Sequence, residues 1–396
     1  MEKLRKTNGI TLIALIITIV VLIILAGVVI IALNGNGGIL NNANKAAEKY
    51  NSKASEEEEL LGTLENKLKE YTGENSDKPT KEPTNVEYFS WTTTETEATI
   101  TGFSDAGKAK YNAGEITELV IPSEYNGLVV TEIGSNAFSK CSGITNINIP
   151  SSVTKIGTFA FLKCTGLTEL YIPKTLQEVG RYIDNTVFYG CTGISKVEFE
   201  EGTTKIIDNI LCNAKLKSGV EIIIPSSVTE IGSSAFSGCS GITNINIPSS
   251  VTEIGSSAFS ECSGITNINI PSSVTKIGID AFTYCTGLTE LFIPKTLQEV
   301  GRYINNTVFY GCTGISKVEF EEGTTKIIDN ILCNAKLKSG AKIIIPSSVT
   351  EIGSSAFYNC NNLTTVNFRG TEAQWNAISI GSSNDPLTSA TKQFNQ

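Results

Sequence analysis

The sequence contains no histidine, and this absence removes several kinds of chemistry. Histidine usually serves as the base of Ser-His-Asp and Cys-His catalytic groups, and it is the commonest transition-metal ligand, so sites that depend on it are excluded. Adjacent glutamates remain, Glu200 with Glu201 and Glu321 with Glu322. A Glu-Glu-Gly sequence is more typical of a solvated turn than of a glycosidase pair. We expect a protein that is not an enzyme and carries no cofactor or metal.

Positive charge is also scarce, because 31 Lys and Arg stand against 40 Asp and Glu, which gives a net charge of −9. Residues 1–9 contribute +2 through Lys3, Arg5 and Lys6 against Glu2, so the remaining residues carry −11. Affinity for nucleic acid comes largely from clustered basic residues that neutralise phosphates. An acidic chain without a basic stripe is therefore not expected to bind DNA or RNA.

One long apolar run is present, the uncharged and proline-free segment 10–33. As a helix it would extend about 36 Å, which is enough to span a bilayer. It is too long for the apolar region of a cleaved secretory signal. Because the basic leader 1–9 precedes it, the positive-inside rule predicts a single-pass protein of the cell membrane with a cytoplasmic N-terminus. The rest of the chain would lie outside the cell.

The junction between the leader and the apolar segment reads Lys6-Thr7-Asn8-Gly9-Ile10-Thr11-Leu12-Ile13. This sequence resembles the class III leader of type IV pilins and pseudopilins, which implies cleavage between Gly9 and Ile10. It departs from that family at Ala14, where pilins usually carry a glutamate that pairs with the amine of the neighbouring subunit. An ordinary signal anchor has the same hydropathy, so both interpretations stay open.

Residues 39–71 carry apolar side chains at intervals of three and four, apart from one gap at Glu57, which places one narrow stripe on a helix. Such a stripe is found in coiled coils and in pilin stems. The acidic run from Glu56 to Glu59 favours a single solvated stalk helix, while self-association through the stalk stays open. Residues 72–85 lack apolar periodicity and predict a flexible linker.

Ten cysteines follow one another at spacings of 21, 23 or 27 residues, and similar sequence surrounds most of them. Periods of this length indicate a solenoid. The clearest copy, residues 247–265, joins an Ile-Pro-Ser-Ser turn to an Ala-Phe-x-x-Cys segment. The sequence also repeats with a longer period of 121 residues, because Gly190–Asn209 matches Gly311–Asn330 nearly letter for letter. A block of repeats has been duplicated.

These repeats resemble the BspA-type leucine-rich repeat family of bacterial surface proteins, whose motif joins a Leu-x-x-Ile-x-Ile-Pro strand to an Ala-Phe-x-x-Cys segment. The resemblance covers residues 86–396. It implies a repeat solenoid, 116–368, with a parallel β-sheet ribbon and short helical or irregular outer segments. Residues 86–115 would form the N-terminal cap, and residues 369–396 resemble the family's C-terminal cap. The resemblance also implies binding to host or matrix proteins, or to other cells.

Alternating apolar residues predict the same ribbon from physical grounds. In Ile144–Ile149, every second residue points inward from Ile147 onward, and strands stack at about 4.8 Å. About eleven such strands are expected between Ile116 and Phe368. Each cysteine would take the same place in its repeat, which favours a column of buried free thiols over disulfides. Metal binding is not expected, because no short paired cysteine spacing occurs.

Outward positions of the strands are the natural place for a binding site, since the inward ones form the core. Most outward residues are polar, but four are apolar or aromatic and recur with the 121-residue period. These four and their charged neighbours are Tyr171, Ile223, Phe292, Ile344, Glu169, Lys196, Glu290 and Lys317. The pattern predicts two similar patches of exposed aromatics beside charges. Alternatively, the insertions of the 27-residue repeats cover these side chains.

We therefore expect a membrane-anchored surface protein whose extracellular solenoid binds extracellular or host matrix proteins, or glycans, with adhesion as its purpose. A second hypothesis, from another class, is a pilin-like structural subunit that carries the solenoid as its head.

Overall fold

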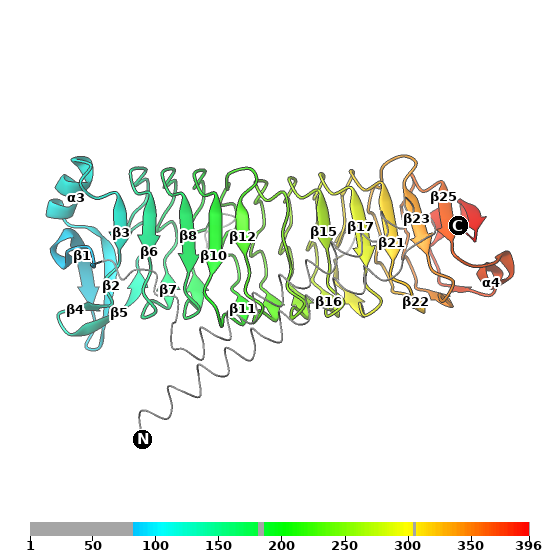
Figure 1. Cartoon of the computed structure of the whole chain (residues 1–396), viewed down its shortest axis with the longest axis horizontal. Coiled ribbons are helices and arrows are strands. Elements are labelled where there is room, and N and C mark those ends of the chain that lie inside the picture. Colours follow the sequence, from blue (N-terminus) through cyan, green and yellow to red (C-terminus); the bar gives the residue numbers. More distant parts are fainter. Residues whose placement is uncertain (1–81, 181–185, 304–305, 396) are drawn as a thin grey trace, which may run out of the picture. The chain divides into compact units, whose positions relative to one another are not determined.

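The structure is a computed structural model that describes residues 82–180, 186–303 and 306–395. These residues form a stack of similar turns with a cap at each end (Figure 1). The predicted leader with its cleavage point, the apolar segment, the stalk and most of the linker lie outside the described residues. Within the described ranges, no helix has the length and apolar character needed to cross a membrane.

Each turn contributes one strand to a parallel ribbon, called here the first ribbon. Residues alternate between core and surface, so Val197 is buried and the adjacent Glu198 is half-buried. Equivalent residues of successive turns lie side by side, as Lys196 does with Glu169. In chain order the strands are β3 (Glu118–Val120), β6 (Asn146–Asn148), β8 (Glu169–Ile172), β10 (Lys196–Phe199), β12 (Glu221–Ile223), β15 (Asn267–Asn269), β17 (Glu290–Ile293), β21 (Lys317–Phe320), β23 (Lys342–Ile345), β25 (Thr365–Phe368) and β27 (Thr391–Phe394).

The predicted solenoid of parallel strands is confirmed, with one correction to the strands themselves. Segment 243–247 occupies its turn but pairs with neither β12 nor β15, so the first ribbon is interrupted there. Ile245 and Ile247 of this segment are still buried. The apolar pattern thus sets the side-chain direction, whereas ladder hydrogen bonds also require neighbouring backbones at the right spacing.

A second parallel ribbon forms from the Val-Thr-x-Ile-Gly part of each repeat. The expected outer segments are therefore only in part irregular, and no helix lies between Asn112 and Glu372 in the described residues. β-Branched residues at alternate positions favour extended backbone. The glycine that follows allows close approach, because a Cβ at Gly255 would lie 2.7 Å from Ser233 N. The strands are β5 (Leu128–Ile133), β7 (Lys155–Ile156), β9 (Glu178–Val179), β11 (Lys205–Ile206), β13 (Glu230–Ile231), β14 (Glu253–Ile254), β16 (Lys276–Ile277), β18 (Glu299–Val300), β22 (Lys326–Ile327), β24 (Glu351–Ile352) and β26 (Ser379–Ile380).

The second ribbon is interrupted after β9 and after β18. Both interruptions coincide with the four-residue insertions of the longest repeats. After β18, the insertion contains a small antiparallel pair, β19 (Arg302–Tyr303) with β20 (Asn306–Thr307). The insertions therefore follow strands of the second ribbon rather than strands of the first.

Aromatic side chains close the N-terminal end of the core. Strands β1 and β2 pair antiparallel, and β2 continues in parallel to β5. The rings of Phe89 and Phe103 meet the Phe138 ring at centroid distances of 6.0 and 5.1 Å. They take the place of a preceding turn. The cap elements are η1 (Val86–Tyr88), β1 (Phe89–Thr93), β2 (Glu97–Phe103), α3 (Asp105–Asn112) and β4 (Glu124–Tyr125).

The C-terminal cap replaces the hydrogen bonds that a further turn would supply. Trp375 packs edge-on against Phe368, with ring centroids 5.4 Å apart. The buried Asn384 accepts a hydrogen bond from Phe357 N at 3.0 Å through Oδ1, and its Nδ2 donates to Gly353 O at 2.9 Å. Backbone groups of the last turn are thereby hydrogen-bonded, and the end of the stack is covered. The two helices are α4 (Glu372–Asn376) and α5 (Asp385–Ser389).

The core consists of columns of equivalent residues. Successive phenylalanine rings stack with centroids 5.2 to 5.5 Å apart, in the order Phe236, Phe259, Phe282 and Phe309. A column of buried thiols, as predicted, stands beside them. Cys262 Sγ donates to Phe236 O at 3.0 Å, a carbonyl of the preceding turn. The other thiols of the column donate in the same way, except that of Cys141 in the first turn. Cysteine suits this place because it is small, apolar and a weak donor.

Two cysteines do not stand in this column, and the prediction that all share one place is wrong for them. Leu211 occupies the phenylalanine position of its turn, because its N–H bonds Ala235 O as Phe236 N–H bonds Ala258 O. Ala214 then fills the thiol position, and Cys212 lies two residues earlier. Cys333 repeats the arrangement 121 residues later. The spacings of 21 and 27 residues around these cysteines reflect this displacement as well as insertions.

Candidate functional site

The duplication gives the solenoid two equivalent regions. We call residues 145–248 block 1 and residues 266–369 block 2, because each residue of block 1 corresponds to the residue 121 positions later in block 2. Both blocks place a row of outward side chains along the first ribbon. These side chains come from the middle of each strand, where the flanking residues are buried.

In block 1, the outward row brings Tyr171, Glu198 and Ile223 side by side on β8, β10 and β12. All three are half-buried. The predicted apolar residues therefore do not touch as a pair, because a glutamate stands between them. Lys196 and Glu169 flank this row as neighbours on the same two strands, and Lys196 Nζ lies 3.0 Å from Glu198 Oε2.

In block 2, the corresponding row consists of Phe292, Glu319 and Ile344 on β17, β21 and β23. Phe292 is exposed over 36% of its surface, so the alternative that the insertions cover these side chains does not hold for this residue. Ile344 is half-buried. Lys317 and Glu290 lie beside one another at the edge of the row.

A shallow hollow of about 230 Å³ opens beside Phe292. Its polar lining combines amides and charges, from Asn267, Asn269, Glu290, Lys317 and Glu319. Three predicted residues, Phe292, Glu290 and Lys317, thus line one hollow, whereas Ile344 stands outside it. An exposed ring surrounded by hydrogen-bonding groups of both signs is the composition of an interface anchor.

Ion pairs organise the charged side of this hollow. Lys317 Nζ lies 2.9 Å from Glu319 Oε2 and 3.9 Å from Glu290 Oε2. Arg369 Nη2 lies 2.7 Å from Glu319 Oε1. The hydrogen bond from Lys317, together with Arg369, lowers the pKa of Glu319. Glu319 is therefore held as a carboxylate between two cations.

Block 1 has a more negative environment around its aromatic residue. Burial raises the pKa of Tyr171 to about 12, and the charges of Glu200, Glu198 and Glu201 add to the effect. Glu200 is tied to the strand-end turn, because it accepts a hydrogen bond from Lys174 N at 3.0 Å and pairs with Lys174 Nζ at 3.2 Å. These contacts give the first glutamate of the Glu-Glu-Gly turn a structural role.

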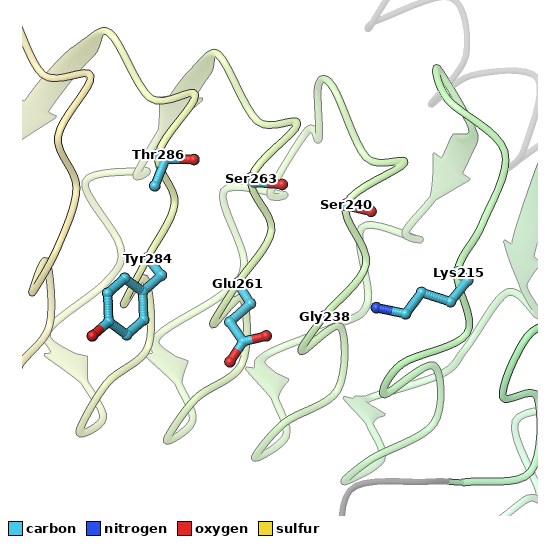
Figure 2. A pocket seen from close by; sticks show the side chains of 7 residues that line it. All are labelled: Lys215, Gly238, Ser240, Glu261, Ser263, Tyr284 and Thr286. Carbon is cyan, nitrogen blue, oxygen red and sulfur yellow. The ribbon is translucent and has the colours of Figure 1, made fainter.

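Another hollow, of about 450 Å³, lies away from the two ribbons (Figure 2). Most of its lining residues directly precede or follow a cysteine in successive turns of the solenoid. Tyr284 and Glu261 project from adjacent turns, and the Lys215 side chain points toward Gly238 from the turn on its other side. Tyr284 is 47% exposed and has a φ of 57°, which is uncommon for a bulky residue. This hollow could not be predicted from the sequence, because its lining residues vary from turn to turn.

Arg369 and Asn267 belong to the candidate site but were not predicted from the sequence. Arg369 occupies the place where most repeats have the strand-end proline, and this exception was the available signal. Asn267 is a polar strand residue that occurs in several repeats, so the sequence carries no signal that distinguishes it. The described residues contain no group of three or more acidic or cysteine side chains arranged to hold a metal ion.

Comparison with known proteins identifies the family of the chain. The profile of the BspA type leucine rich repeat region matches residues 107–220, 218–304 and 299–384. No curated protein matches the chain. A leucine-rich repeat protein from Bacteroides ovatus is 20% identical, covers 78% of this chain and 99% of its own, and has a TM-score of 0.38. A leucine rich cell surface protein from Faecalibacterium prausnitzii is 25% identical, with coverage of 77% and 99% and a TM-score of 0.33. The chain belongs to the BspA-type leucine-rich repeat family.

Proposed function

We propose that the chain is a cell-surface binding protein that acts in adhesion, and that the outward row of its first ribbon contacts the partner. The observation that carries this proposal is the hollow beside Phe292, where an exposed aromatic ring lies among Asn269, Lys317 and Glu319. Large exposed aromatic side chains with charged neighbours supply most of the binding energy in many interfaces. The partner is an extracellular or host matrix protein, or a glycan.

Binding of the full chain to an array of matrix proteins and glycans tests this proposal. The Tyr171→Ala/Phe292→Ala variant removes both aromatic residues of the row and is expected to weaken binding by at least about tenfold. Tyr284→Ala is the matched control, because Tyr284 is an exposed aromatic away from the ribbons. Equal loss in the control, or no loss in the double variant, would refute a role for the outward row.

We also propose that segment 10–33 anchors the chain in the cell membrane, with the solenoid outside. The support is the uncharged run of 24 residues that follows a basic leader. Protease added to intact cells should then digest the solenoid and leave residues 1–9 protected. A solenoid that is degraded only after lysis contradicts this topology.

The pilin-like alternative rests on the sequence around Gly9 and Ile10. It predicts that the mature chain begins at Ile10 and that purified surface filaments contain it. N-terminal sequencing separates the two anchors, because a signal anchor keeps Met1.

A further inference from the structure

One pair of carboxylates in block 2 already holds a guanidinium. Arg369 Nη2 lies 2.7 Å from Glu319 Oε1, and Arg369 Nη1 donates to Glu322 Oε1. The planar fork of arginine can bind two carboxylates at once in a fixed geometry. Glu319 and Glu322 therefore form a guanidinium site that is filled from within the chain.

Block 1 contains the same carboxylates but not the arginine. Glu198 and Glu201 correspond to the block 2 pair, and the residue that corresponds to Arg369 is Pro248. Among the described residues, Glu198 has an ion pair with Lys196 through Oε2, and none is found for its Oε1 or for Glu201. The pair of carboxylates is therefore present in both blocks, whereas the arginine that occupies it is present only in block 2.

Exposure of the two glutamates reflects this difference. The lysine contact is the same in both blocks, with Lys196 3.0 Å from Glu198 and Lys317 2.9 Å from Glu319. The Glu198 side chain is nevertheless 41% exposed, against 21% for Glu319. Arg369 is the additional side chain on Glu319, so its absence leaves the block 1 carboxylate open to solvent.

The surroundings of Glu198 also suit an arginine. Tyr171 and Ile223 stand on either side of it in the strand register. Arg369 follows β25 and reaches its carboxylates on the far side of β23, so its path crosses the strand of Ile344. The same path in block 1 crosses Ile223, which offers an apolar surface to an arginine stem.

We propose that block 1 binds an arginine side chain of a partner protein at Glu198 and Glu201, in the place that Arg369 fills in block 2. This inference rests on the proposed function and narrows its partner to a protein segment with an exposed arginine. The net charge of −9 also favours encounter with a basic segment. Block 2 is closed to the same group, because its own arginine already occupies the carboxylates.

A peptide with one central arginine in a Gly-Ser-Leu background is a suitable probe, with a citrulline peptide of the same sequence as its control. The full chain, immobilised in a mild detergent, should bind the arginine peptide at one site. Glu198→Gln/Glu201→Gln should weaken this binding by at least about tenfold. The matched variant Glu319→Gln/Glu322→Gln should leave it unchanged, which controls for loss of acidic charge.

Moving the internal arginine gives the converse test. Arg369→Ala should open block 2 and double the peptide bound at saturation, and Pro248→Arg should fill block 1 and remove wild-type binding. Unchanged saturation in Arg369→Ala, equal binding of the citrulline peptide, or no effect of the block 1 glutamines would overturn the inference. Each of these results leaves the proposed function standing if the array target still binds and is lost in Tyr171→Ala/Phe292→Ala. Circular dichroism checks that every variant folds.

Discussion

Block 1 and block 2 share the columns of their core but differ on their surfaces. Equivalent columns stack in the same way, since Phe161 with Phe188 and Phe282 with Phe309 have centroid distances of 5.4 and 5.5 Å. Outward residues diverge, as Tyr171 does from Phe292. In a solenoid the core of each turn packs against the neighbouring turns, so a duplicated block brings its own core and leaves its surface to vary. The difference shows which positions the fold requires.

The largest effect should come from the core, and it should be equal in the two blocks. Phe188→Ala and Phe309→Ala each remove a fully buried ring that stacks on one neighbouring ring. Each should cost about 3–5 kcal/mol, through lost burial and the cavity left behind. Urea unfolding measures both. A difference above about 1 kcal/mol would show that the blocks do not have equivalent cores.

A second comparison concerns buried thiols and alkaline pH. Cys239 and Cys360 correspond, are fully buried, and donate to Leu211 O and Leu332 O at 3.0 Å. Burial raises the pKa of each to about 12. Because folding favours the neutral thiol, its contribution is complete below the unfolded pKa of about 8.5 and is lost as pH rises toward the folded value.

Each thiol should therefore cost up to about 1.4 kcal/mol of stability per pH unit above about pH 9. Cys239→Ala and Cys360→Ala should flatten the alkaline fall in stability by equal amounts. Unfolding midpoints at pH 8 and pH 10.5 measure this. If the slopes of the two variants match the wild type, the thiols do not remain protonated in the folded state.

Most of this fold follows from the sequence because its interactions are local and repeated. Period and strand direction rest on apolar spacing, which the Ile-x-Ile-Pro and Ala-Phe segments display in many copies. The second ribbon was missed, because two-residue strands such as Glu253–Ile254 are too short for alternation to appear. The interruption at 243–247 was missed since its sequence is the same Asn-Ile-Asn-Ile that pairs normally elsewhere.

The candidate site could be predicted only in part. Outward position follows from alternation within one strand, so Phe292 and Lys317 were placed by counting. Contacts between turns depend on how far a side chain reaches. Arg369 follows β25 and contacts Glu319 two turns away, and counting within a repeat does not reveal such a pairing.

A glycine pair gives a smaller effect that should differ between blocks. Gly190 and Gly311 correspond and have φ of 75° and 71°, so alanine should cost about 1 kcal/mol at either. A Cβ at Gly311 would also lie 2.6 Å from the Tyr284 ring, whereas at Gly190 it meets Lys163 Cγ at 3.2 Å. Gly311→Ala should therefore be the more destabilising. Adding Tyr284→Ala should remove the excess, and persistence of the excess would show that the ring is not its cause.

The smallest effect concerns the two outward glutamates. Glu319 contacts Lys317 and Arg369, whereas among the described residues Glu198 has an ion pair only with Lys196. Glu319→Gln should cost about 0.5–1 kcal/mol at pH 7 and Glu198→Gln roughly half of that, because these pairs are partly screened by solvent. Since the folded pKa of Glu319 is lowered, its contribution is present above about pH 4.5 and is lost as pH falls through the folded value. The cost of Glu319→Gln, measured by urea unfolding, should thus shrink toward pH 3. Equal costs of Glu319→Gln and Glu198→Gln at pH 7 would show that the contact of Glu319 with Arg369 adds nothing to the free energy of unfolding. The effect of Arg369 would then be only to keep outside ligands from Glu319 and Glu322.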